Sequence, residues 1–173
     1  VTRASTILFE TMQEMYRHEA KIKQHKNVTH YTYGRYGSTT TIELENILKE
    51  LEKAYHVFLT GTGFGGIALA LMSLCRPGDE ILVSDNVYGP TKEISEKLLK
   101  EFNINAKFYN PISFDDLRNK VTKKTKMILV ENPGSNTFEF QDLSKIVSLA
   151  KKKKIFTFLD NTWGTPLYLK PLK

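Results

Sequence analysis

The sequence predicts an α/β fold: a mostly parallel sheet with helices on both faces. From residue 55 onward, short runs of apolar residues alternate with segments of helical character, which is typical of βαβ units. The run Met127-Ile128-Leu129-Val130 is apolar throughout, as expected for a strand covered on both faces. With 173 residues and 40% hydrophobic content, the chain is also long enough to bury a core.

The first 54 residues precede this alternation. Residues 8–24 carry helix formers with apolar residues at helical spacing, so at least part of this segment is expected to be helical. Residues 27–38 are polar and aromatic without a clear period, which predicts a loop. The pattern at residues 40–43 is that of a capping box, and it predicts a helix that ends near Ala54. We expect residues 1–54 to form an N-terminal arm with this helix, and residues 55–173 to form the α/β domain.

The α/β domain should contain five strands, at residues 56–59, 81–83, 106–109, 127–130 and 155–159. Between them we expect a glycine-rich turn at 61–66 followed by a helix to residue 74, and helices at 90–102, 114–121 and 141–153. Ligands of such sheets bind outside the carboxyl ends of the strands. The candidate functional segments are therefore those that directly follow strands: 61–66, 85–88, 131–135 and 160–163.

Composition argues against several classes of function. The net charge of +6 comes mainly from lysines at predicted helix ends and loops, around residues 120–126 and 151–154, rather than from arginines and aromatics on one face, so no nucleic-acid binding is expected. The four histidines lack metal-ligand spacing, and Cys75 alone excludes an internal disulfide or a cysteine zinc site. No apolar run approaches a membrane span of about 18 residues, and the first residues lack a signal-peptide pattern. We expect a cytoplasmic protein without a metal.

The glycine-rich turn supports two interpretations. Gly61-Thr-Gly-Phe-Gly-Gly66 matches the G-x-G-x-x-G pattern of dinucleotide-binding proteins, and Asp85 lies nineteen positions beyond Gly66 at the end of the next predicted strand. An NAD-binding oxidoreductase is therefore one alternative. However, backbone N–H groups at a helix N-terminus bind any phosphate, including a phosphate monoester. The turn predicts a phosphate site without identifying the molecule.

Four further motifs occur in order: Tyr33-Gly-Arg-Tyr-Gly37, Val87-Tyr-Gly-Pro-Thr91, Glu131-Asn-Pro-Gly-Ser135 and Asp160-Asn-Thr-Trp163. Together they resemble the pyridoxal 5′-phosphate (PLP) enzymes of cysteine and methionine metabolism, and the resemblance runs from Arg3 to the end of the chain. It implies that residues 55–173 are part of the large PLP-binding domain of a fold-type I enzyme, and that residues 1–54 contact a partner subunit. The pair Gly134-Ser135 is most similar to the cystathionine β-lyases, since many related γ-synthases and γ-lyases carry Asn at the position of Ser135.

The resemblance also implies roles for individual residues. Asp160 would keep the pyridine nitrogen of the cofactor protonated, Tyr88 would stack on the ring, and Ser135, or Asn136 beside it, would bind the phenolic oxygen. Tyr33 and Arg35 would reach the phosphate of a neighbouring subunit, which implies a homodimer or homotetramer. The implied cofactor-binding residues are Tyr33, Arg35, Gly63, Phe64, Tyr88, Ser135, Asp160 and Thr162, with Tyr33 and Tyr88 also catalytic.

The implied reaction is the α,β-elimination of L-cystathionine to homocysteine, pyruvate and ammonia in methionine biosynthesis. The lysine that binds the cofactor covalently is expected about two dozen residues beyond Asp160, and the arginine that binds the substrate carboxylate in a C-terminal domain. Because both lie beyond Lys173, the 173 residues alone are expected to be inactive and to expose an unpaired sheet edge. The alternatives are a γ-synthase or γ-lyase of the same family, a non-catalytic remnant or interaction subunit, and the NAD-binding fragment.

Overall fold

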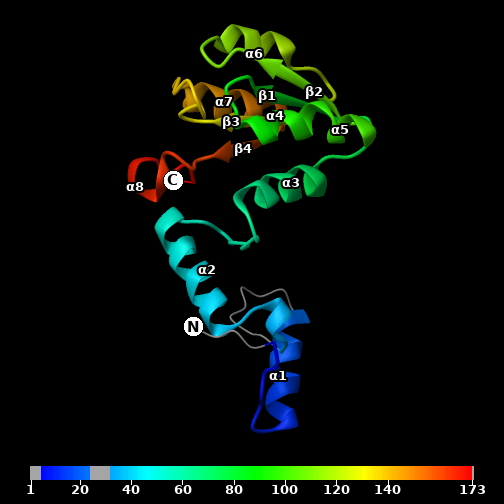
Figure 1. Ribbon diagram of the computed structural model, residues 1–173, viewed down its shortest axis with the longest axis vertical. Helices are drawn as coiled ribbons and strands as arrows, with labels where there is room; N and C mark the ends of the chain where they lie inside the picture. The colour runs from blue at the N-terminus through cyan, green and yellow to red at the C-terminus, as the bar shows by residue number, and fades with distance from the viewer. Residues whose placement is uncertain (1–4, 24–31, 173) are drawn as a thin grey trace. The chain divides into compact units, whose positions relative to one another are not determined.

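The computed structural model describes residues 5–23 and 32–172, and the chain divides into two compact units, residues 1–59 with 172–173, and residues 60–171. The first unit contains α1 (Met12–Lys23), a 3-10 turn η1 (Gly34–Tyr36) and α2 (Thr39–Glu52) (Figure 1). Helix α1 begins four residues later than residue 8, and the last predicted residue, 24, lies outside the described residues, as does the start of the predicted loop, 27–31.

Helix α2 begins earlier than the sequence pattern predicted. Ser38 is its N-cap: the Ser38 hydroxyl accepts the N–H of Thr41, and the Thr41 hydroxyl accepts the N–H of Ser38 at 2.8 Å. The capping box therefore consists of Ser38 and Thr41. The capping box predicted at residues 40–43 is wrong, because the N-cap lies two residues before Thr40. Ser38 takes the cap because it is the last residue in extended conformation, whereas Thr40 is already helical.

The second unit contains a sheet of four parallel strands in the order β2-β1-β3-β4. The strands are β1 (Glu80–Ser84), β2 (Asn105–Tyr109), β3 (Thr125–Glu131) and β4 (Phe156–Asp160). The predicted α/β class and parallel sheet are confirmed. The fifth predicted strand is wrong, because residues 56–59 form no strand in the structure. A strand requires backbone hydrogen bonds to a neighbour, and these residues belong to the first unit, whereas the whole sheet belongs to the second.

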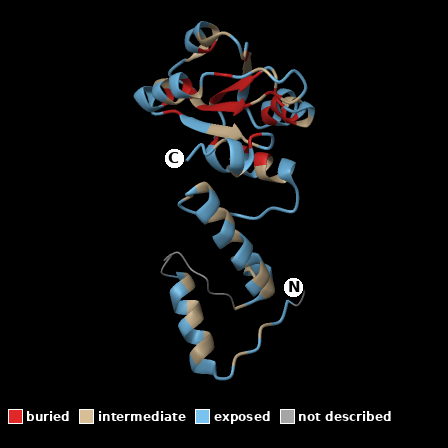
Figure 2. Cartoon of the chain, turned by 90° about the vertical axis from the view of Figure 1, so that its left-hand side faces the viewer, coloured by how far each residue is buried: buried red, intermediate tan, exposed pale blue. Residues whose placement is uncertain are grey.

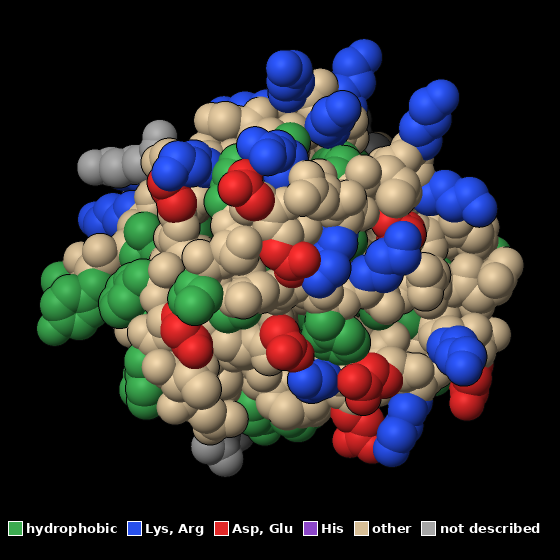
Figure 3. All heavy atoms as spheres, turned by 90° about the horizontal axis from the view of Figure 1, so that it is seen from above, with side chains coloured by type: hydrophobic (Ala, Val, Ile, Leu, Met, Phe, Trp, Pro, Cys, Tyr) green, Lys and Arg blue, Asp and Glu red, His purple; other side chains and the backbone are tan. Residues whose placement is uncertain are grey.

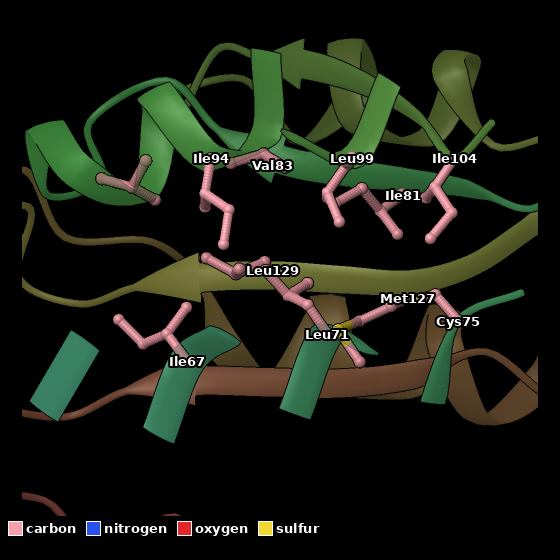
Figure 4. Close-up of a cluster of buried hydrophobic side chains, with 11 residues drawn as sticks. Ile67, Leu71, Cys75, Ile81, Val83, Ile94, Leu99, Ile104, Met127 and Leu129 are labelled. Carbon is pink, nitrogen blue, oxygen red and sulfur yellow. The ribbon is translucent and has the colours of Figure 1, made fainter. Parts of the chain in front are cut away.

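Helices cover both faces of this sheet. On one face, Ile81, Val83, Met127 and Leu129 pack against α3 (Gly63–Leu74), α4 (Gly89–Glu96) and α5 (Leu98–Glu101) (Figure 4). On the other face, the intervening strand residues pack against α6 (Phe114–Lys120) and α7 (Leu143–Lys153). Figure 2 shows the buried residues of this unit concentrated in the strands and in the helices packed on them. Each buried aliphatic side chain contributes about 1.5–3 kcal/mol, so this alternation fixes the strand register.

Several helices differ from the predicted ranges. Helix α3 begins at Gly63, inside the turn predicted at 61–66, because Thr62 caps it. The helix predicted at 90–102 is interrupted at Lys97, and the Ser95 hydroxyl donates to the Thr91 carbonyl at 2.7 Å within its first half, a type of bond that often bends helices. Helix α7 begins at residue 143 rather than 141 because the side chain of Asp142 caps it and accepts the N–H of Lys145 at 3.0 Å. A short helix, α8 (Thr165–Tyr168), was not predicted.

Helix α3 runs opposite to the strands. Ile67, near its N-terminus, lies near Leu129, whereas Cys75 at its end lies near Met127, which is closer to the start of β3 (Figure 4). The N-terminus of α3 therefore points toward the carboxyl edge of the sheet. The glycine-rich turn that opens this helix is thereby placed at the edge where the strands end.

Candidate functional site

The carboxyl edge of the sheet brings together the segments that follow β1, β3 and β4. Glu131 and Asp160 are the last residues of β3 and β4 and are paired in the register of these two parallel strands. Strand β3 lies between β1 and β4, so the loop after β1 reaches the other side of Glu131. Three of the four segments predicted from the sequence thus converge at one edge, and the fourth opens α3.

Glu131 is the centre of this arrangement. It is 3% exposed, and its Oε2 accepts the backbone N–H of Tyr88 at 2.7 Å. Burial raises the pKa of the Glu131 carboxyl and the charge of Asp160 raises it further, whereas the Tyr88 N–H and the Ser135 side chain offset this in part. Three of the predicted site residues, Tyr88, Ser135 and Asp160, therefore surround one buried carboxyl group.

Glu131 itself was not among the residues predicted to bind the cofactor, although its segment was nominated. The available signal was a single charged residue at the end of the apolar run 127–130. Its pairing with Asp160 depends on the register of β3 and β4, which becomes visible only in the folded sheet.

Thr162 fixes the carboxyl group of Asp160. Asp160 Oδ1 accepts the backbone N–H of Thr162 at 3.0 Å and the Thr162 hydroxyl at 2.5 Å. Such an Asx-type turn holds the side chain at the end of its strand. The Asp160 carboxylate is half-buried, so it remains available to a group that approaches from the edge of the sheet.

The Tyr88 ring is accessible while its backbone is held. The residue is 47% exposed and is the N-cap of α4, with its N–H bound by Glu131. An aromatic ring with one open face offers a stacking surface for a planar ligand.

Close packing joins the loop of Tyr88 to the loop of Ser135. The N–H of Ser135 donates to the carbonyl of Asn86 at 2.9 Å. A Cβ at Gly134 would lie 2.1 Å from Asn86 Nδ2, so only glycine allows this approach. Ser84 donates to Asn86 Oδ1 at 2.5 Å, and Asn86 Nδ2 donates to Glu139 at 3.3 Å, which fixes the amide between two further partners. The two loops therefore hold each other in place.

A chain of buried side-chain hydrogen bonds leads to Ser84, which contacts Asn86 of the first loop. The Tyr109 hydroxyl donates to Gln141 Oε1 at 2.8 Å, and Gln141 Nε2 donates to the Ser84 hydroxyl at 2.9 Å. Burial raises the pKa of Tyr109, so the phenol stays protonated as a donor. Fully satisfied buried networks of this kind rigidify their surroundings.

The first turn of α3 presents backbone donors. The Thr62 side chain caps the helix and accepts the N–H of Gly65 at 2.9 Å. Gly63 and Phe64 precede Gly65 in this turn and are exposed, and a Cβ at Gly63 would meet nothing within 4 Å. The N–H groups of a first helical turn have no acceptor within the helix, and with the helix dipole they favour a phosphate.

Tyr33 and Arg35 belong to the first unit and form a cluster of their own. The Arg35 guanidinium lies 5.6 Å from the centroid of the Tyr33 ring and 5.0 Å from that of Tyr36, and it donates to the Tyr36 hydroxyl at 3.0 Å. These contacts hold an exposed cation in a defined direction.

Other kinds of site find little support in the described part of the chain. Residues 5–23 and 32–172 contain no group of three or more His, Cys, Asp or Glu side chains that could hold a metal ion. No helix among them is long and apolar enough to cross a membrane. On the face drawn in Figure 3, Lys and Arg side chains are interspersed with Asp and Glu rather than gathered in one stripe.

The groups at the carboxyl edge and at the start of α3 fit the separate parts of PLP. A carboxylate such as Asp160 matches a protonated ring nitrogen, the open ring of Tyr88 matches the face of a pyridine, and the first turn of α3 matches a phosphate. An NAD-type site would instead engage Asp85, which forms an ion pair with Lys92 at 2.6 Å.

Several known proteins are similar to this chain in sequence. A protein of Saccharomyces cerevisiae with the provisional name cystathionine beta-lyase is 37% identical over 166 residues, which cover 96% of this chain and 46% of that protein. An L-alanine/L-glutamate racemase of Wolbachia pipientis is 32% identical over 178 residues, covering 99% of this chain and 43% of that protein. Further relatives at 28% to 34% identity are named cystathionine beta-lyase.

The fold is also found among solved structures. The crystal structure of cystathionine gamma-lyase from Lactobacillus plantarum in complex with L-serine matches with a TM-score of 0.83 and 26% identity, over 98% of this chain and 40% of that chain. This chain thus spans less than half the length of the relatives it matches.

The sequence profile of one enzyme family covers the whole chain, residues 1–173. This match replaces the dinucleotide interpretation of the glycine-rich turn and confirms the resemblance seen in the motifs. The chain belongs to the family of Cys/Met metabolism PLP-dependent enzymes.

Proposed function

We propose that this chain is the cofactor-binding part of a carbon–sulfur lyase that cleaves L-cystathionine by α,β-elimination to homocysteine, pyruvate and ammonia. The observation that carries the proposal is the convergence of Tyr88, Ser135 and Asp160 around Glu131 at the carboxyl edge of the sheet. The names of several relatives support cystathionine as the substrate.

In this proposal each residue performs a simple task. PLP, when bound, supplies the electron sink for the bond changes at the substrate α-carbon. Asp160, held by Thr162, keeps a proton on the ring nitrogen, and Tyr88 packs on the ring face. The backbone N–H groups of Gly63 and Phe64 bind the phosphate. The Ser135 hydroxyl binds the phenolic oxygen of the ring.

Tyr33 and Arg35 are proposed to act on a second copy of the chain. A guanidinium can bind two phosphate oxygens at once, and Arg35 is exposed and oriented by the rings of Tyr33 and Tyr36. A homodimer or homotetramer would place this cluster at the phosphate of a neighbouring subunit. Replacing Arg35 with alanine should then weaken PLP retention while leaving the melting temperature of the subunit close to that of the wild type.

The reaction is tested by the products formed from L-cystathionine with the protein purified from cells that produce it. Pyruvate with homocysteine supports α,β-elimination. The formation of 2-oxobutyrate with cysteine would instead identify a γ-lyase. Conversion of L-alanine to the racemate, with no keto acid from cystathionine, would identify a racemase. A protein that retains PLP and performs none of these reactions would be a non-catalytic member of the family.

A pair of variants links the reaction to the site. Asp160→Asn should lower the rate of pyruvate formation by about 100-fold or more, since the amide cannot keep the ring nitrogen protonated. Asp115→Asn is the matched control, because Asp115 is an exposed aspartate of α6 whose side chain is 71% accessible. Equal rates in both variants would contradict the role of Asp160.

A further inference from the structure

Glu131 ends the strand that lies between the strand followed by the Tyr88 loop and the strand that ends at Asp160. Strand β3 has β1 on one side and β4 on the other. The loop after β1 carries Tyr88, and Asp160 ends β4 in register with Glu131. A side chain at this position can contact both neighbours at once.

The contact with Tyr88 is made to the backbone. Glu131 Oε2 accepts the Tyr88 N–H at 2.7 Å, a bond between residues 43 positions apart in the chain. Because the Cα–Cβ direction of a residue follows from its backbone, this bond sets the direction from which the exposed Tyr88 ring extends. It also ties the start of α4 to the end of β3.

A carboxyl group at this buried position lowers the stability of the fold, so stability alone does not explain Glu131. Glu131 is 3% exposed, and the neighbouring carboxylate of Asp160 opposes its ionisation. Buried polar groups that work against stability are expected at functional sites. Glu131 has such a functional role if its carboxyl group, beside Asp160, serves to accept the Tyr88 N–H.

We propose that Glu131 is a positioning residue that holds the Tyr88 backbone in the arrangement that binds the ring of the cofactor. This inference rests on the proposed function. Glu131 does not contact the reacting atoms in this arrangement. It acts through Tyr88.

The test compares Glu131→Ala with Glu131→Gln in the protein as purified. Glutamine keeps an oxygen that can accept the Tyr88 N–H, whereas alanine removes it. Hydrogen–deuterium exchange, followed by mass spectrometry with fragmentation that resolves residue 88, should be at least about tenfold faster at the Tyr88 amide in the alanine variant. The glutamine variant should exchange within about twofold of the wild type.

PLP retention gives the second measurement. The dissociation constant for PLP should rise about tenfold or more in Glu131→Ala and be restored in Glu131→Gln, because only the former loses the acceptor. Glu80→Ala is the matched control: Glu80 is similarly buried but begins β1, at the opposite end of the sheet. It should lower the melting temperature without changing PLP affinity, which separates positioning from a general loss of stability.

The outcomes are distinct. Unchanged exchange at Tyr88 in Glu131→Ala, or faster exchange with unchanged PLP affinity, would overturn the inference. Equal loss of affinity in the alanine and glutamine variants would also overturn it, because the acceptor would then not matter. A wild-type protein that retains no PLP would overturn the proposed function and the cofactor part of this inference, while the exchange at Tyr88 would still decide whether Glu131 holds the loop.

Discussion

Glu80 and Glu131 are two buried glutamates at opposite ends of neighbouring strands. Glu80 begins β1 and is 5% exposed, and Glu131 ends β3 and is 3% exposed. Glu80 forms an ion pair with Lys107 of β2 and accepts the hydroxyls of Thr122 and Thr125 at 3.1 Å each. Glu131 has no such cation among its described contacts and instead faces Asp160. Similar burial therefore coexists with opposite electrostatic surroundings.

The pKa values follow this difference. Burial alone would raise the pKa of Glu80, but the hydrogen bonds from Lys107, Thr122 and Thr125 outweigh it and lower the pKa. At Glu131, burial and Asp160 together raise the pKa. The amino edge of the sheet is thus arranged for stability, because its glutamate ties β1 to its neighbours. The carboxyl edge places two carboxyl groups side by side, as expected where binding takes precedence over stability.

Removing the stabilising glutamate should have the largest effect on stability. Glu80→Ala should lower the free energy of unfolding by about 2–3 kcal/mol, because two threonine hydroxyls lose their acceptor and the cation loses its partner. The half-exposed position of Lys107 limits the loss, since its ammonium can return to water. Urea unfolding measures the effect. A loss below that of a surface variant such as Glu93→Ala would contradict the stabilising role.

A substitution at Gly134 tests how tightly the loop of Ser135 packs against the loop of Tyr88. Gly134→Ala would place a Cβ 2.1 Å from Asn86 Nδ2 and should lower the free energy of unfolding by about 1–2 kcal/mol through overpacking. PLP affinity should fall with it, because Ser135 follows directly. Gly89→Ala is the control, since a Cβ there meets nothing within 4 Å. Equal stability of the two variants would show that Asn86 yields to the added methyl group without loss.

Most of the sheet could be predicted from the sequence. The apolar run 127–130 indicated a strand covered on both faces, and β3 has helices packed on both sides. The rule that ligands bind at the carboxyl ends of strands located Tyr88, Ser135 and Asp160 at one edge. The strand predicted at 56–59 failed because β-propensity describes the residues of a strand and not whether a neighbouring strand is present.

The centre of the site could not be predicted in the same way. Glu131 matters because of its register with Asp160 and its bond to Tyr88, 43 residues away in sequence, and neither is visible in a local pattern. The close approach of Gly134 and Asn86 is similarly hidden, because a glycine after proline is also the usual sign of an ordinary turn.

The two glutamates should also give the protein opposite responses to pH. A lowered pKa at Glu80 contributes stability that is present above its ordinary value of 4.5 and is lost as the pH falls through the lower folded value. A raised pKa at Glu131 means that the folded state holds this proton more tightly, so stability is lost as the pH rises from 4.5 through the higher folded value. Unfolding free energies of Glu80→Gln and Glu131→Gln, measured between pH 3.5 and pH 7, should differ from the wild type with opposite signs at neutral pH. Differences of the same sign would contradict the comparison.

The smallest expected effect is the most specific to the carboxyl edge. At neutral pH, Glu131→Gln should raise the free energy of unfolding by about 0.5–1 kcal/mol, because the neutral amide keeps an acceptor for the Tyr88 N–H without placing a second negative charge beside Asp160. The double variant Glu131→Gln/Asp160→Asn isolates the cause. If repulsion between the two carboxyl groups is responsible, the gain from glutamine should shrink in the Asp160→Asn background, since the neighbouring charge is already absent. A gain of the same size in both backgrounds would assign the effect to burial of Glu131 alone.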